Sequence, residues 1–168
     1  LDAIAQNPEV EEIIPDIPLF ISRTESVKII EADKAHGTTV NNQTLQGQGT
    51  SICILDTGTY PHNELVQQLV QAPDFVNNDN DANDDHGHGT HVTGIAHATA
   101  PQAKLLTPKV CDATGVCFLS SVLAGIDYCT NASQQNNITV ISGSFGEGAY
   151  NSTSCPNYID DALAGVVQ

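Results

Sequence analysis

The fold is decided by His86-Gly87-His88-Gly89-Thr90-His91-Val92-Thr93-Gly94, taken together with the earlier stretch Ile52-Cys53-Ile54-Leu55-Asp56-Thr57-Gly58. The earlier stretch predicts an apolar strand that delivers the Asp56 carboxylate onto a tight turn. The later stretch predicts a glycine-rich turn that places His88 at the start of a helix. A buried carboxylate that orients a histidine supplies two of the three members of a nucleophilic triad. Asp56 and His88 are therefore the candidate catalytic residues, and we expect the third member outside this chain.

The rest of the sequence alternates between strand and helix patterns. Strands are predicted over residues 51–55, 103–110 and 138–142, and helices over residues 88–98, 119–130 and 156–168. This order predicts an α/β fold with a parallel sheet and helices on both faces. Sites in such sheets form at the carboxyl ends of the strands. Asp56 and the turn Ser142-Gly143-Ser144 each follow a strand, so both are expected at that edge. The last helix still has an apolar face at Gln168, which predicts a fold that is incomplete at its C-terminal end.

The first 21 residues have a different pattern from the rest. Residues 1–6 suggest the end of a helix, and residues 10–21 an extended segment interrupted by Pro15 and Pro18. A capping-box pattern then begins a helix at Ser22. Residues 41–49 are polar and contain glycine, which predicts a surface loop. We therefore divide the chain at residue 21.

Composition excludes some classes of partner. The 168 residues carry 20 acidic and 5 basic side chains, a formal charge of −15. Phosphate backbones repel such a chain, so nucleic acid is not an expected partner. No apolar run reaches the roughly 18 residues that cross a bilayer, so no membrane partner is expected. Four glycosylation-type sequons, beginning at Asn42, Asn131, Asn137 and Asn151, are compatible with secretion.

The cysteines also indicate an oxidising compartment. Cys111 and Cys117 flank a short loop that suits a local disulfide. Cys129 and Cys155 are a candidate second pair, although the sequence does not fix connectivity. Cys53 lies inside the apolar strand before Asp56 and is interpreted as a small buried hydrophobic residue.

Two other chemistries compete for these motifs. His86, His88 and His91 suggest zinc, but they lack the i, i+4 histidine spacing and the glutamate of helical zinc sites. Asp-Thr-Gly after an apolar strand also occurs in aspartic peptidases, in which two carboxylates share one proton. This chain has one such motif, so that mechanism needs a symmetric dimer and leaves the histidine stretch without a role.

Together these motifs resemble the subtilisin family of serine peptidases. Asp-Thr-Gly, His-Gly-Thr-His-Val-x-Gly and Val140-Ile141-Ser142-Gly143-Ser144-Phe145-Gly146 carry the resemblance, as does Pro61-His62-Asn63-Glu64-Leu65. The resemblance implies that Asp56 orients His88 and that His88 is the general base. It also implies that Ser144, Phe145 and Gly146 pair with a polypeptide substrate. Residues 1–21 would be the C-terminal tail of an inhibitory prosegment and residues 22–168 the N-terminal part of the peptidase domain, with a processing site near residues 20–26.

The same resemblance implies what the chain lacks. The family's nucleophilic serine and its oxyanion-hole asparagine would lie in the remaining C-terminal part of the domain, which is therefore an expected partner. The chain alone is expected to be an inactive fragment of a secreted zymogen, with no organic cofactor. A non-catalytic module that binds peptide along residues 144–146 is the main alternative.

An acidic run precedes His88. Residues 74–85 combine Asp and Asn side chains without Lys or Arg, and oxygen ligands of this kind suit calcium. The glycine and closing glutamate of an EF-hand are absent. The spacing is similar to a calcium loop in heat-stable subtilisin relatives, and this likeness places Asp74, Asn77, Asp79 and Asp81 around a structural calcium ion. A second calcium-binding insertion common in subtilisins is missing between Ala96 and Pro101.

Overall fold

The computed structural model of the chain describes residues 18–21 and 32–146. The expected helices that begin at Ser22 and Pro156 lie largely or wholly outside these residues, and so does the segment 1–17. None of the helices in the described part of the chain is long and apolar enough to cross a membrane.

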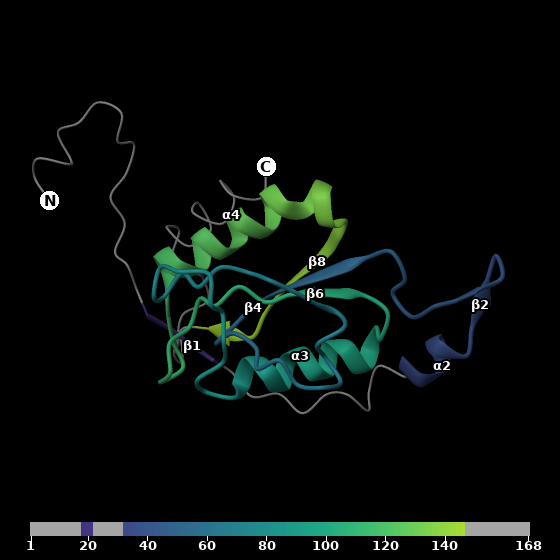
Figure 1. Cartoon of the computed structure of the whole chain (residues 1–168), viewed down its shortest axis with the longest axis horizontal. Helices are drawn as coiled ribbons and strands as arrows, with labels where there is room; N and C mark the ends of the chain where they lie inside the picture. The colour runs from purple at the N-terminus through teal and green to yellow at the C-terminus, as the bar shows by residue number, and fades with distance from the viewer. Residues whose placement is uncertain (1–17, 22–31, 147–168) are drawn as a thin grey trace, which may run out of the picture.

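A four-stranded parallel sheet forms the centre of the fold (Figure 1). Its strands, in spatial order, are β5 (Leu69–Val70), β6 (Lys104–Leu106), β4 (Ser51–Leu55) and β8 (Ile138–Gly143). β4 is central because it is apolar on both faces, as strands buried between two helical layers are. Leu55 is in register with Gly143, so the residues that follow them, Asp56 and Ser144, emerge at the same edge of the sheet.

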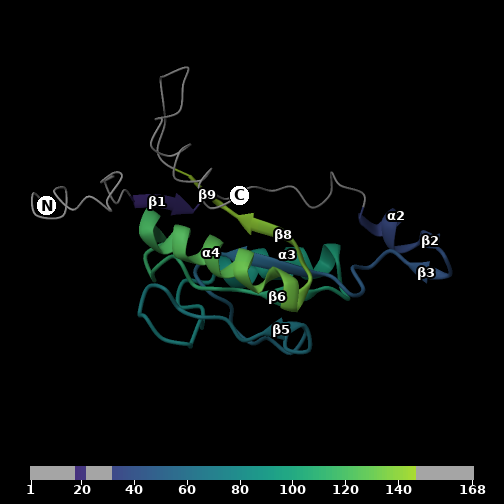
Figure 2. The same cartoon turned by 90° about the horizontal axis from the view of Figure 1, so that it is seen from above.

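Two helices cover opposite faces of this sheet. α3 (His88–Thr99) and α4 (Leu119–Asn136) lie on either side of it (Figures 1 and 2). Successive side chains of a strand point to opposite faces. Accordingly, Cys53 and Leu55 pack in a core cluster with Val122 of α4, whereas Ile54 packs in a second cluster with Val92 of α3. The predicted α/β class with helices on both faces is confirmed.

Element boundaries differ from the sequence-based prediction in three places. β6 is shorter than the expected strand because the chain reaches Pro108, which cannot donate to a ladder. α4 continues six residues further, to Asn136, because no glycine or proline interrupts the polar run 131–136; Asn137 then ends it in the left-handed conformation, with φ of 50°. A small hairpin, β2 (Thr39–Val40) and β3 (Gln43–Thr44), begins just before the expected loop 41–49 and extends into it, and α2 (Ala32–His36) precedes it.

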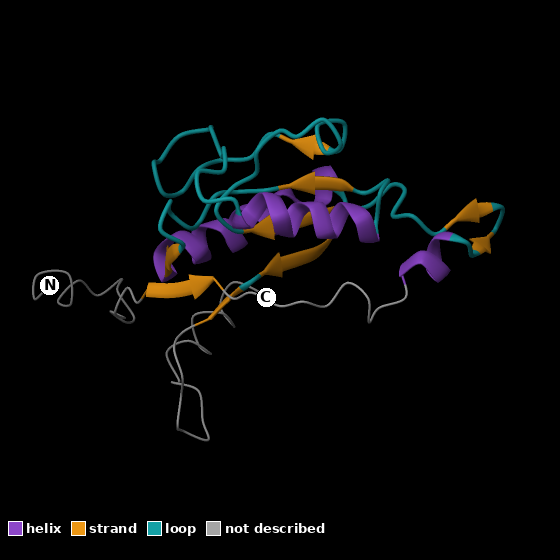
Figure 3. Ribbon diagram, turned by 90° about the horizontal axis from the view of Figure 1, so that it is seen from below, coloured by secondary structure: helices purple, strands orange, loops and turns teal. Residues whose placement is uncertain are grey.

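A second, antiparallel sheet joins segments that lie far apart in the sequence. β1 (Pro18–Ile21) is its middle strand, between β7 (Val116–Phe118) and β9 (Phe145–Gly146) (Figure 3). Phe20 is in register with Val116 on one side and with Gly146 on the other. The extended segment predicted up to residue 21 therefore ends as a strand held on both edges.

The disulfide prediction is half right. Cys111 pairs with Cys117, as predicted. The second pair is Cys53–Cys129, so the proposed Cys129–Cys155 pair and the free Cys53 are both wrong. The inward-facing Cys53 of β4 meets the inward face of α4, a contact that strand and helix periodicity alone did not reveal. This bridge ties the central strand to the helix that covers it.

Candidate active site

The Asp56 and His88 side chains are in direct contact. Asp56 follows β4 and is 1% exposed, and His88 begins α3 and is 9% exposed. His88 Nδ1 lies 2.8 Å from Asp56 Oδ1 and 3.0 Å from Oδ2. Because a carboxylate only accepts hydrogen bonds, Nδ1 carries the proton, and Nε2 is the nitrogen left for proton transfer.

Backbone donors fix the Asp56 end of this pair. Its Oδ1 also accepts a hydrogen bond of 2.7 Å from the Thr57 N–H. Its carbonyl oxygen accepts hydrogen bonds of 2.9 and 3.1 Å from the N–H groups of Val110 and Cys111. The carboxylate and the main chain of Asp56 are thus both anchored, which leaves the carboxylate little freedom to turn away from His88.

Two glycines allow the two turns to approach closely. A Cβ on Gly89 would lie 2.0 Å from the Gly58 carbonyl oxygen, and a Cβ on Gly58 would lie 2.4 Å from the Ala82 carbonyl oxygen. Gly58 also has φ of 92°, in the left-handed region that favours glycine. Gly89 is therefore required by the contact between the turn after Asp56 and the start of α3, and Gly58 by its conformation and by its contact with Ala82.

Asp84 connects the same two segments, and the sequence analysis did not single it out. Its Oδ1 accepts hydrogen bonds from Thr57 Oγ1 and from the N–H groups of His86 and Gly87, and its Oδ2 accepts one from the Thr90 N–H. It thereby caps the start of α3, where Gly87 has no side chain to do so. The sequence carried one signal for this role, because Asp84 is a carboxylate that lies four residues before the expected start of the helix.

Burial by itself would raise the pKa of Asp84, but hydrogen bonds from the Thr90 side chain and from the main chain of Gly87, Thr90 and His86 hold that pKa below its ordinary value of 3.8. A folded-state pKa that is depressed contributes stability above the unfolded-state pKa. That contribution is lost as the pH falls through the lower, folded-state value.

Replacing Asp84 with Asn should therefore flatten the acid limb of the stability curve. We expect Asp84→Asn to lower Tm near neutral pH, with the difference from wild type shrinking as the pH falls from about 6 to about 2. Thermal melts monitored by circular dichroism measure this. Asp127→Asn, which alters an exposed carboxyl on α4, is the matched control. A wild-type-to-variant difference that stays constant with pH would contradict the role given to Asp84.

The predicted calcium residues do not form a cage in this arrangement. Asp74 is 2% exposed, and both of its oxygens accept internal hydrogen bonds: Oδ1 from the N–H groups of Val76 and Asn77, and Oδ2 from Asn77 Nδ2. The Asp79 carboxylate accepts from the Asp81 N–H. Within the described ranges, no three His, Cys, Asp or Glu side chains lie together as a metal site, and this includes the histidines considered for zinc.

Calcium binding by Asp74, Asn77, Asp79 and Asp81 stays a prediction. If calcium braces this loop, Tm measured with calcium should exceed Tm measured after EDTA treatment. Asp79→Asn should reduce that difference, because it removes one charged ligand. Equal Tm values in calcium and in EDTA would contradict the prediction.

Of the three residues predicted to bind a peptide backbone, Ser144 lies at the same sheet edge as Asp56, and Phe145 and Gly146 belong to the antiparallel sheet. Ser144 follows β8 at the level at which Asp56 follows β4, and Phe145 and Gly146 form β9. Ile21 of β1 is in register with Phe145. The residues predicted to bind a peptide backbone therefore pair with an extended segment of this chain. The strand that pairs with the other edge of β1, β7, was not predicted from the sequence.

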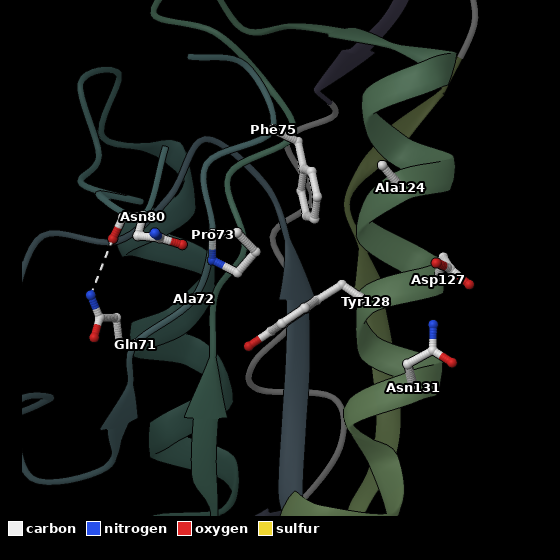
Figure 4. Close-up of a pocket in the computed structure, with 9 residues that line it drawn as sticks. All are labelled: Gln71, Ala72, Pro73, Phe75, Asn80, Ala124, Asp127, Tyr128 and Asn131. Atoms are coloured by element: carbon white, nitrogen blue, oxygen red, sulfur yellow. Dashed lines mark hydrogen bonds between the residues drawn. The ribbon is translucent and has the colours of Figure 1, made fainter. Parts of the chain in front are cut away.

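A cavity beside α4 is a separate feature. It has a volume of about 710 Å³ and lies between residues 71–80 and α4 (Figure 4). Tyr128 extends from α4 across it, with its ring 6.3 Å from that of Phe75 in an edge-to-face contact, and burial raises the pKa of the Tyr128 hydroxyl. Neither Asp56 nor His88 lines this cavity, and we assign it no part in the pair's chemistry.

The chain resembles known proteases in sequence. It is 30% identical to a thermostable alkaline protease of Halalkalibacterium halodurans over 91% of this chain and 42% of that protein. It is 34% identical to thermitase of Thermoactinomyces vulgaris, over 70% and 44% of the two chains. It is 32% identical to the serine protease AprX of Bacillus subtilis, over 63% and 26%. The chain thus spans less than half the length of these relatives.

Structure and family comparison agree with these matches. The crystal structure of a cold-adapted subtilisin-like serine proteinase superposes with a TM-score of 0.61 at 25% identity, over 81% of this chain and 50% of that one. The sequence profile described as the Subtilase family matches residues 47–166, which include both segments of the candidate pair. The chain belongs to the subtilase family.

Proposed function

We propose that this chain is the part of a serine-type endopeptidase that carries the acid and the base of an Asp-His-Ser triad. The observation that carries the proposal is the contact of 2.8 Å between His88 Nδ1 and Asp56 Oδ1 at the carboxyl edge of the sheet. Asp56 orients the imidazole and fixes its tautomer, which leaves Nε2 to act as the base. Membership of a family whose named relatives are proteases supports the assignment.

The chemistry follows the established triad mechanism, for which subtilisin itself is a reference case. His88 Nε2 accepts the proton of a serine hydroxyl supplied by the remaining part of the domain, while the serine oxygen attacks the carbonyl carbon of the peptide bond. The imidazolium then gives this proton to the leaving amine, and an acyl-enzyme forms. In the second half of the reaction, His88 Nε2 accepts a proton from water, whose oxygen attacks the carbonyl carbon of the ester. The imidazolium then returns a proton to the serine oxygen as the ester bond breaks. Asp56 stays ionised throughout and stabilises the imidazolium.

The substrate would bind as an extended strand. β1 lies between β7 and β9 and pairs with both, so these two strands form a slot that accepts a polypeptide backbone. Ladder hydrogen bonds use the main chain, so the slot fits peptides of many sequences. One of these two strands, β9, consists of Phe145 and Gly146, and it directly follows Ser144 at the edge where Asp56 emerges.

The occupant of this slot also supports the proposed role of residues 1–21. An inhibitory prosegment tail should bind where a substrate binds, and β1 is the end of that segment. The two disulfides support an oxidising compartment, in agreement with a secreted protein. A non-catalytic peptide-binding module is the second candidate function, because the slot needs no nucleophile to hold a strand.

The aspartic mechanism is disfavoured by the same contact. In that mechanism one carboxylate shares a proton with a second carboxylate, whereas the Asp56 carboxylate is turned toward His88 and the Thr57 N–H.

Covalent labelling separates these possibilities. The parent polypeptide that contains this chain should cleave casein, react with a fluorophosphonate at a serine, and be insensitive to a statine-type inhibitor of aspartic peptidases. Loss of labelling in His88→Ala would connect the reaction to this chain. Binding of peptides without cleavage or labelling would leave the binding module, and inhibition by the statine compound would favour the aspartic mechanism.

A further inference from the structure

Lys109 is a buried cation in an otherwise acidic corner of the molecule. Its side chain is 1% exposed, whereas Lys34 and Lys104, the other lysines of the described segments, are exposed. An ammonium group has three N–H donors. All three have acceptors here: the Thr57 carbonyl oxygen at 2.9 Å, the Cys111 carbonyl oxygen at 2.9 Å and Asp85 Oδ1 at 2.6 Å.

The main chain explains why the side chain points this way. Lys109 forms parallel bridges with Asp56 and with Asp74, so its backbone lies between the extension of β4 and the start of the acidic run. The next two N–H groups along the chain donate to the Asp56 carbonyl oxygen. With the backbone fixed beside Asp56, the long side chain reaches the following carbonyl, that of Thr57.

The three acceptors belong to three different segments. Thr57 directly follows Asp56. Asp85 lies three residues before His88, and Cys111 belongs to the loop closed by the local disulfide. One ammonium group therefore joins the segment that carries the carboxylate to the segment that carries the imidazole. Asp84 links the same two segments through the Thr57 hydroxyl, but it adds negative charge to the corner, which Lys109 offsets.

We propose that Lys109 is a positioning residue for the pair: its ammonium group holds Thr57 and Asp85 so that the Asp56 carboxylate and His88 Nδ1 remain in contact. The inference concerns the geometry of the pair that the proposed function uses. Its test does not need any peptide hydrolysis, so its failure is distinguishable from failure of the proposed function.

The burial of the charge makes this role specific to an ammonium group. Substitution by an apolar side chain of similar length leaves the Thr57 and Cys111 carbonyl oxygens without their donor in a dry environment, and leaves Asp85 without its cation. The turn after Asp56 and the loop before His88 then lose this link and are joined less firmly, through the hydrogen bonds that Thr57 Oγ1 makes with Asp84 and with the Gly89 N–H. The three acceptors lie outside the strands of the parallel sheet and outside α4, so the hydrogen bonds within those elements should persist.

The test follows the Nδ1–H proton of His88 by NMR in the 168-residue chain. A proton held between imidazole and carboxylate resonates far downfield and exchanges slowly with water. We expect this resonance in wild type and in Lys104→Met, the exposed control on β6. In Lys109→Met it should vanish or exchange at least about tenfold faster, while amide exchange in α4 stays within about twofold of wild type.

A folded Lys109→Met that keeps the resonance and its exchange rate would overturn the proposal. If Lys109→Met does not fold, Asp85→Ala decides, because Asp85 is 47% exposed and its truncation leaves the buried lysine its two carbonyl acceptors. Faster exchange of the His88 proton in Asp85→Ala than in Asp127→Ala supports the positioning role. Equal exchange rates in these two variants would overturn it.

Discussion

Replacement of His88 by Ala in the proposed endopeptidase should lower kcat by roughly a million-fold, the magnitude known from subtilisin, and Asp56→Asn by roughly ten-thousand-fold, the magnitude known from a chymotrypsin-type triad. The physical reason for the difference is that His88 carries the proton, whereas Asp56 only orients and stabilises the ring to which it is bound. KM should change little, because the strand-pairing slot between β7 and β9 contains neither residue. Steady-state kinetics on a chromogenic peptide measure both parameters.

His91→Ala is the matched control for this prediction. His91 lies on the same helix, three residues further along, and is exposed, so its removal alters the histidine stretch without touching Asp56. We expect kcat within about twofold of wild type. A His88→Ala protein that retains more than a small fraction of activity would remove His88 from the mechanism, and equal losses in His88→Ala and His91→Ala would indicate a folding defect.

Removal of the Cys53–Cys129 bridge should produce the largest loss of stability. The two cysteines are 76 residues apart, so in the chain-entropy description the bridge contributes about 4 kcal/mol to the free energy of unfolding. Both side chains are fully buried in the core between β4 and α4, so the variant Cys53→Ala/Cys129→Ala also loses packing there. Urea denaturation measures the free energy of unfolding of this variant against wild type.

The second bridge supplies the comparison. Cys111 and Cys117 are six residues apart, and closing so short a loop contributes about 2 kcal/mol. Cys111→Ala/Cys117→Ala should therefore lose about half as much. If the two double variants lose equal free energy, loop entropy is not what makes the Cys53–Cys129 bridge stabilising.

Much of the fold was predictable because periodicity depends on local chemistry. The strand at residues 51–55 was predicted with its correct limits, and the helix from His88 ends at Thr99, one residue beyond the prediction. What sequence periodicity cannot give is which buried faces meet. Cys53 was expected to be unpaired because nothing local shows that its side chain faces Cys129. The pairing of β1 with β7 and β9 depends on the same kind of distant contact.

The candidate site likewise contains residues that local sequence patterns predict and residues whose roles depend on distant contacts. Asp56 and His88 were found from motifs whose glycines are needed for close approach of the two turns. Asp84 was hidden in a run of acidic residues that all suggested a solvated or ion-binding loop. Lys109 did carry a signal: it is the one charged residue of the largely apolar stretch 105–111, and such a residue is buried only when acceptors surround it. The sequence contained the residue but not the identity of its three acceptors.

The position of β1 has a consequence for how the slot can be reached. A strand joined covalently to the protein that binds it competes at an effective concentration of about a millimolar, whatever the concentration of the chain in solution. A free peptide with micromolar affinity would have to displace β1, which stays attached to the protein. Access to the slot therefore depends on whether the chain between β1 and the rest of the molecule stays intact as well as on how tightly β1 pairs.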